Sequence, residues 1–362
     1  MSVINYPLIM YDLLIIGAGP AGISAAFEAK KQNLSYLVIE KGLIGNTIYN
    51  YPVGLTVFST VNELEFAKGE LQPARRKPTR EELLSYYVRF VLENELNIQT
   101  EEKVREVRSA ECGVRNKKNA EARTLVRAKS SAEDTVFHVT TDKAEYESRS
   151  VLFAIGAMDY PRSLGVKGEK LPKVHDHFRE TYPWVKKSAL IIGGGNSAGE
   201  AALFLAEEGA DTTLAIFRND WESTDPKHGC IKYWVKQPLE KELKKNCLKL
   251  FFLGKVLEIR DDEVLLENES GEVETLPNDV VFVLIGSDAD LTMLKNLGVK
   301  TVKGKSGEVP VYDEETFETN VNGVYVAGHF TNHRHIKDAI AVPKKIVPKI
   351  AASLKIESGI RN

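Results

Sequence analysis

Short runs of mostly apolar residues recur along the chain, and a glycine-rich or polar turn follows them. They occupy residues 12–16, 36–39, 151–155, 189–192, 212–217, 280–285 and 323–328. Apolar runs of this length without alternation are typical of strands buried in a parallel sheet. Apolar residues at helical spacing follow two of the turns, in 23–31 and 199–208. The alternation of strands and helices predicts a doubly wound α/β fold.

Other stretches have weaker patterns. Thr79 and Glu82 have the spacing of a capping box, which predicts that a helix begins there. Residues 103–148 alternate weakly and predict antiparallel strands, and we expect the charged part, 111–134, to be an exposed insertion. Residues 46–58 have no clear period, which predicts a loop.

Length and charge exclude several classes of protein. A chain of 362 residues is long enough for two domains. Its net charge of −3 lacks the basic surplus of a nucleic-acid-binding protein. No apolar run approaches the ~20 residues that span a bilayer, and residues 1–10 have no signal-peptide pattern. We therefore expect a cytoplasmic protein without a membrane partner.

The chain has three cysteines, Cys112, Cys230 and Cys247, and no C-x-x-C pair. So few cysteines without regular spacing are typical of a reducing compartment, and they predict neither a disulfide framework nor a zinc site.

The first glycine turn carries a dinucleotide-binding pattern. Gly17 permits a tight turn, Gly19 lets a phosphate approach the backbone, and Gly22 lets the helix pack on the strand. The positive end of the helix then faces the pyrophosphate. Glu40, at the end of the next strand, can bind a ribose 2′-hydroxyl, which favours FAD or NAD over NADP. The residues predicted to form this first site are Gly17, Gly19, Pro20, Ala21, Gly22, Glu40 and Lys41.

A second glycine turn repeats the pattern with one important difference. Arg218, rather than an acid, follows its second strand, and an arginine there can bind a 2′-phosphate. NADPH is therefore favoured over NADH, although Asp220 lies close by and Arg218 could be a plain surface residue. The predicted second site consists of Gly193, Gly195, Asn196, Ser197, Ala198 and Arg218. Two such sites predict hydride transfer from NADPH to FAD and then to another acceptor.

The order of these motifs resembles two-dinucleotide-binding flavoproteins of the thioredoxin-reductase type. Residues 39–42, 48–52, 171–174 and 316–320 are most similar to the bacillithiol disulfide reductase branch. The resemblance implies a homodimer and two Rossmann-like domains: an FAD-binding domain formed by 1–159 and 288–362, with an NADPH-binding domain, 160–287, inserted. It adds to the expected cofactor-binding residues Tyr49, Asn50, Gly156, Gly286, Gly328 and His329. The stretch around Tyr49 and Asn50 would lie beside the flavin ring, or else form an aromatic core patch.

Three departures from the family pattern concern the chemistry. The region where thioredoxin reductases carry a C-x-x-C dithiol contains residues 174–178, without cysteine. Many members of the bacillithiol branch have a cysteine in the first glycine turn, where this chain has Ala21. The second FAD motif usually ends in Gly-Asp, whereas here His329 follows Gly328.

Candidate catalytic residues are therefore few. His175 and His177 occupy the place of the dithiol and are either proton donors or polar linker residues. Cys230 has basic neighbours that would lower the pKa of its thiol, or it is an inert small residue. The histidines after Gly328 favour an anion- or flavin-facing role over a metal site, and we predict no metal.

The leading interpretation is an FAD-dependent NADPH oxidoreductase with an external electron acceptor. That acceptor is a low-molecular-weight disulfide such as bacillithiol disulfide, a quinone, or a redox protein, as in a ferredoxin/flavodoxin–NADP reductase. A flavin-dependent monooxygenase matches less well, because Gly168 and His175 are seven residues apart instead of four. A non-catalytic flavin-binding protein is the remaining alternative.

Overall fold

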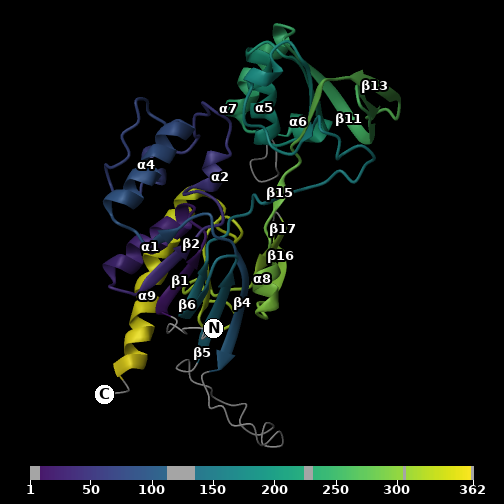
Figure 1. Cartoon of the computed structure of the whole chain (residues 1–362). Helices are drawn as coiled ribbons and strands as arrows, with labels where there is room; N and C mark the ends of the chain where they lie inside the picture. Colours follow the sequence, from purple (N-terminus) through teal and green to yellow (C-terminus); the bar gives the residue numbers. More distant parts are fainter. Residues whose placement is uncertain (1–8, 112–134, 224–230, 305–306, 360–362) are drawn as a thin grey trace, which may run out of the picture. The chain divides into compact units, whose positions relative to one another are not determined.

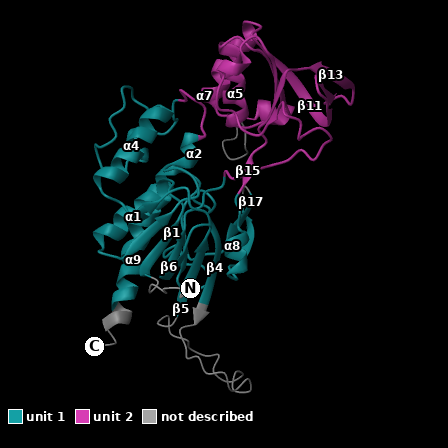
Figure 2. Ribbon diagram, in the orientation of Figure 1, with its two compact units in different colours: residues 1–49, 56–157, 289–362 teal, residues 50–55, 158–288 magenta. Residues whose placement is uncertain are grey.

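The computed structural model describes residues 9–111, 135–223, 231–304 and 307–359. The chain divides into two compact units, coloured teal and magenta in Figure 2. Unit 1 contains residues 1–49, 56–157 and 289–362, and unit 2 contains residues 50–55 and 158–288.

The sheet of unit 1 has a parallel centre. Leu14 and Ile16 of its central strand are buried, as the apolar run predicts. The strands of the parallel part are β1 (Met10–Ile16), β2 (Tyr36–Ile39), β3 (Ile98–Gln99), β6 (Glu145–Phe153) and β18 (Val324–Val326). They pair in the order β3-β2-β1-β6, and β18 pairs with the C-terminal half of β6. The last strand of the chain thus lies in the same sheet as the first.

An antiparallel extension completes this sheet. β4 (Val104–Glu111) pairs with β5 (Thr135–Thr141), and β5 pairs with the N-terminal half of β6. This confirms the antiparallel strands predicted from the weak alternation. The predicted insertion spans residues 111–134: Glu111 is the last residue of β4, and residues 112–134 lie outside the described part of the chain.

The α-helices of unit 1 in the described ranges are α1 (Pro20–Lys31), α2 (Asn46–Tyr49), α3 (Val61–Leu64), α4 (Arg80–Glu93), α8 (Thr292–Asn296) and α9 (Ile336–Gly359). α1 and α9 lie side by side in Figure 1, and the Ser24 hydroxyl donates to the carbonyl of Ile340 at 2.7 Å. The C-terminal helix is therefore part of the core around the first glycine turn.

The predicted capping box begins α4. The Glu82 amide donates to the Thr79 hydroxyl at 3.2 Å, and the Glu82 carboxylate accepts from the Thr79 amide at 2.8 Å. The predicted loop at 46–58 is wrong for its first residues, because Asn46–Tyr49 form α2. The amides of Ile48 and Tyr49 both donate to the carbonyl of Gly45. A single turn of helix is too short to leave a period in the sequence.

Unit 2 is built around a second sheet, in the order β13-β12-β11-β10-β9-β14-β8. Its strands are β8 (Val174–His175), β9 (Ser188–Ile192), β10 (Asp211–Ile216), β11 (Leu248–Ile259), β12 (Glu263–Asn268), β13 (Val273–Pro277) and β14 (Val280–Val283). β8 to β10, β14 and the first half of β11 are parallel, and β11 to β13 continue as an antiparallel meander.

The helices of unit 2 are α5 (Asn196–Glu207), α6 (Arg218–Glu222) and α7 (Tyr233–Lys244). Ala201 of α5 and Leu239 of α7 are buried against one face of the sheet, and residues of the meander such as Val256 fill the other. Two short strand pairs complete the described strands. In unit 2, β7 (Tyr160–Pro161) pairs with β15 (Ser287–Asp288), and in unit 1, β16 (Thr301–Gly304) pairs with β17 (Gly307–Pro310). The predicted α/β fold with two dinucleotide-binding sheets is confirmed.

The two helices that follow the glycine turns, α1 and α5, begin at Pro20 and Asn196, three residues before the predicted starts at residues 23 and 199. The glycine turn itself therefore enters the first helical turn. None of the helices in the described ranges is long and apolar enough to cross a membrane.

Candidate functional site

Two glycines close the first turn, between β1 and α1. Gly17 has a φ of 109°, and a Cβ there would lie 2.5 Å from the carbonyl oxygen of Ala154. A Cβ on Gly22 would lie 1.8 Å from the carbonyl oxygen of Gly17. Neither position has room for any side chain, so both glycines are required by the packing of strand, turn and helix.

Gly19, by contrast, faces open space. Among the described residues, apart from Gly19 and its two chain neighbours, no atom lies within 4 Å of the position that its Cβ would take. Gly19 is the N-cap of α1, and no side chain of the described part of the chain caps that helix end. Pro20, with no N–H of its own, begins the helix, and Ala21 is buried behind it. An uncapped helix N-terminus beside open backbone fits the pyrophosphate of a dinucleotide.

Glu40 lies at the end of β2 and is buried. Its carboxylate accepts from the amide of Ala18 at 2.7 Å and from the amide of Gly42 at 2.7 Å. The carboxylate is thereby fixed against the glycine turn, at the place where an acid binds the hydroxyls of a ribose. Lys41, next to it, is exposed.

Sequence reasoning missed Arg80, a buried cation at the start of α4. Its Nε and Nη2 donate to the carbonyl of Tyr49 at 3.2 and 2.5 Å, and its guanidinium carbon lies 5.4 Å from the centre of the Tyr49 ring. Arg80 therefore fixes the end of α2. The predicted flavin neighbours Tyr49 and Asn50 fall in different units, and Asn50 is exposed. No local pattern reveals that an arginine at a helix start is buried.

The C-terminal segment meets the first glycine turn. A Cβ on Gly328 would lie 3.3 Å from the Cβ of Ala21, and Gly156, three residues after β6, faces open space. His329 follows and is largely buried. Burial, together with the positive charges of Arg334 and His335, lowers the pKa of His329 to about 4. Its ring is therefore neutral at pH 7.

The second glycine turn in unit 2 has the same construction. A Cβ on Gly193 would lie 2.3 Å from the carbonyl oxygen of Leu284, whereas Gly195 faces open space and is the uncapped N-cap of α5. The Asn196 side chain accepts from the amide of Lys232 at 2.8 Å. Of the other predicted residues, Ser197 is exposed, Ala198 is buried, and Gly286 has a left-handed φ of 96°.

Two carboxylic acids lie close to this second turn. A Cβ on Gly194 would lie 2.2 Å from a carboxylate oxygen of Asp220, so Asp220 covers the turn, and burial raises its pKa. Glu200 lies on α5, one helical turn after Asn196. Burial raises the pKa of Glu200 to about 7. Sequence reasoning missed Glu200, although its spacing from Asn196 places both residues on one face of α5.

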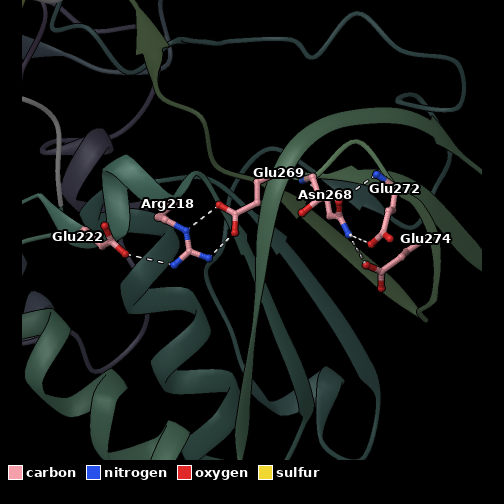
Figure 3. A network of polar contacts seen from close by, with 7 residues as sticks. Arg218, Glu222, Asn268, Glu269, Glu272 and Glu274 are labelled. Atoms are coloured by element: carbon pink, nitrogen blue, oxygen red, sulfur yellow. Dashed lines mark hydrogen bonds and ion pairs between the residues drawn. The ribbon is translucent and has the colours of Figure 1, made fainter.

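Arg218 opens α6 and lies in a network of carboxylates (Figure 3). Its Nε donates to Glu269 at 2.7 Å, Nη2 donates to the other oxygen of Glu269, and Nη1 donates to Glu222 at 3.2 Å. Its guanidinium carbon lies 3.8 Å from the centre of the Phe252 ring. The hydrogen bonds to Glu269, and then to Glu222, raise the pKa of Arg218.

The candidate catalytic histidines both lie in unit 2. His175 is part of β8 rather than of an irregular linker, and its ring centre lies 5.4 Å from Trp184 and 5.5 Å from Phe282. Burial lowers the pKa of His175. His177 is exposed, with Nδ1 2.7 Å from a carboxylate oxygen of Asp176. Cys230 lies outside the described residues, and among those residues no cluster of His, Cys, Asp or Glu could hold a metal ion.

Comparison with known proteins agrees with this geometry. Residues 14–129 and 114–328 match the family model described as pyridine nucleotide-disulphide oxidoreductase. Bacilliredoxin reductase Bdr of Bacillus subtilis (strain 168) is 34% identical over 321 residues, which are 89% of this chain and 90% of that protein. The structure of bacillithiol disulfide reductase Bdr (YpdA) from Staphylococcus aureus is 31% identical, with a TM-score of 0.81 over 95% of this chain and 99% of the other.

A ferredoxin–NADP reductase of Ignicoccus hospitalis is 29% identical over 328 residues, 89% of this chain and 90% of the relative. The resemblance drawn from the two glycine turns, to thioredoxin-reductase-like flavoproteins and their bacillithiol disulfide reductase branch, is confirmed.

Proposed function

Because this chain belongs to the pyridine nucleotide-disulphide oxidoreductase family, we propose that it binds FAD and NADPH and reduces a disulfide supplied from outside the chain. The observation that carries the proposal is the pair of glycine turns. Packing requires Gly17 and Gly22 in the first turn and Gly193 in the second. Each turn also has one glycine, Gly19 or Gly195, that faces open space at an uncapped helix N-terminus. Packing alone gives no reason for glycine at the open positions, whereas a bound pyrophosphate does.

FAD fits the first turn, because Gly19 leaves room for a pyrophosphate and Glu40 is held where a ribose would lie. When bound, FAD accepts a hydride from the nicotinamide and releases two electrons to the acceptor. The protein's part is to hold the two nucleotides at Gly19 and Gly195. Neutral His329, beside Gly328, can offer a hydrogen bond there without adding charge.

The proposed acceptor is a low-molecular-weight disulfide such as bacillithiol disulfide. Two relatives that match nearly the whole chain carry the names bacilliredoxin reductase and bacillithiol disulfide reductase. In the overall reaction, NADPH, one proton and the disulfide give NADP⁺ and two thiols. The S–S bond breaks and two S–H bonds form. The sequence has no C-x-x-C pair, and Ala21 occupies the first turn, so the proposal assigns no internal dithiol to the transfer.

A ferredoxin or flavodoxin is the second candidate acceptor. The relative from Ignicoccus hospitalis, named ferredoxin–NADP reductase, favours it and matches as much of the chain as the first. The relative named for a disulfide shares more identity, 34% against 29%, and this difference decides the order of the two candidates.

Anaerobic stopped-flow spectroscopy tests the proposal. NADPH added to the FAD-loaded protein should bleach the flavin, and bacillithiol disulfide should restore its visible absorbance while free thiols appear. Oxidised ferredoxin, flavodoxin and a quinone are offered in parallel. Restoration by ferredoxin or flavodoxin alone would select the second candidate. A flavin that neither NADPH nor NADH bleaches would refute both.

A further inference from the structure

The guanidinium edge that a 2′-phosphate would use is already occupied. A phosphate binds an arginine best through two parallel N–H···O bonds. In this structure, Nε and Nη2 of Arg218 make that pair of bonds with the two carboxylate oxygens of Glu269 (Figure 3). Glu222 takes a third donor, Nη1. Glu269 therefore stands in the place of a phosphate on this arginine.

Glu269 is held in this position by its own hairpin. It follows β12, and its amide donates to the carbonyl of Phe252 at 3.1 Å, the residue whose ring lies under Arg218. Asn268 stabilises the turn, because its side-chain oxygen accepts from the amides of Ser270 and Glu272 at 2.9 and 3.0 Å. The carboxylate thus reaches Arg218 from a fixed turn.

The local charge opposes a second anion. Arg218 brings one positive charge, and Glu269 and Glu222 bring two negative charges, which leaves a net charge of −1. A phosphate monoester adds about −1.5 to −2 at pH 7. NADPH must therefore displace Glu269 from Arg218, whereas NADH, with a 2′-hydroxyl, leaves the pair intact.

We propose that Glu269 sets the coenzyme preference of the second site, by competing with the 2′-phosphate for Arg218 and so raising the use of NADH relative to NADPH. This inference rests on the proposed function, in which unit 2 binds the pyridine nucleotide. Glu269 is in this sense a specificity-determining residue, and it lies 51 positions from the arginine that it controls.

Replacing Glu269 tests the inference. Glu269→Gln should raise the ratio of kcat/KM for NADPH to that for NADH by about tenfold, because it frees the guanidinium for the phosphate. The matched control is Glu272→Gln. It removes a carboxylate of the same turn, one that accepts a hydrogen bond from the side chain of Asn268 and not from Arg218, and it should leave the ratio unchanged. In the double variant with Arg218→Gln, the gain should disappear.

Ligand binding tests the same inference without catalysis. Titration calorimetry of the FAD-loaded protein with adenosine 2′,5′-bisphosphate and with 5′-AMP should show about tenfold tighter binding of the bisphosphate in Glu269→Gln, and no change for 5′-AMP. Equal affinities of wild type and variant for the bisphosphate would overturn the inference. A protein that binds these fragments as expected but whose flavin neither NADPH nor NADH bleaches would refute the proposed function alone.

Discussion

His329 follows Gly328 where related flavoproteins usually have an aspartate. A carboxylate at this place is charged at neutral pH, whereas burial and the nearby Arg334 keep the imidazole neutral. The substitution therefore replaces a charged acceptor by a neutral ring that can donate or accept one hydrogen bond at each nitrogen. It also makes the stability of the first unit depend on pH, because the folded protein disfavours protonation of His329.

We expect His329 to destabilise the fold as the pH falls. The unfolded chain binds a proton at His329 near pH 6.5, and the folded protein only near pH 4. Stability is therefore lost between these values, by about 3 kcal/mol in total. His329→Gln should lose less free energy of unfolding than the wild type between pH 7 and pH 4.5, as measured by urea unfolding. Equal losses in the wild type and the variant would show that His329 does not cause the acid destabilisation.

Single residues differ in how far the sequence reveals them. Glu40 and Arg218 were predicted at strand ends, because their places follow from the pattern immediately around them. The partner of Arg218 could not be predicted, since only the folded hairpin brings Glu269 to it. The same applies to Arg80, which is buried, and to Glu200, which is half-buried, because their surroundings depend on the packing of elements far apart in the chain.

The strand–turn–helix element is the part of the molecule that sequence predicts best. The run 36–39 matches β2 residue for residue, because an apolar strand ends where polar residues begin. The helix starts differ by three residues and α2 was missed, since neither a helical turn inside a glycine loop nor a one-turn helix has a period of its own.

Two glycines of the first turn should respond oppositely to alanine. Gly22→Ala should destabilise the protein by about 3 kcal/mol, because its Cβ would overlap the carbonyl of Gly17. Gly19→Ala should keep the stability of the FAD-free protein but weaken FAD binding about tenfold or more, because the methyl group fills the open space. Thermal unfolding and FAD titration measure the two effects. A Gly19→Ala variant that binds FAD as wild type does would argue against a dinucleotide at this turn.

At the scale of the whole molecule, the absence of a C-x-x-C pair from the sequence limits the number of electrons that one chain can store. FAD takes two electrons, and an internal disulfide would take two more. We therefore expect an anaerobic dithionite titration to reach full reduction at about two electrons per FAD. An endpoint near four would reveal a second redox centre, such as a disulfide between cysteines of two chains.

The division of unit 1 into separate segments of the chain has a consequence for its synthesis. A ribosome completes residues 158–288 before it makes β18 and α9, which pair with β6 and pack on α1. The hydroxyl of Ser24, for example, donates to the carbonyl of Ile340, which is synthesised 316 residues later. The second unit is therefore synthesised in full first, and the proposed FAD site is complete only when translation is almost over. A premature stop within the last helix would damage the site that the first residues encode.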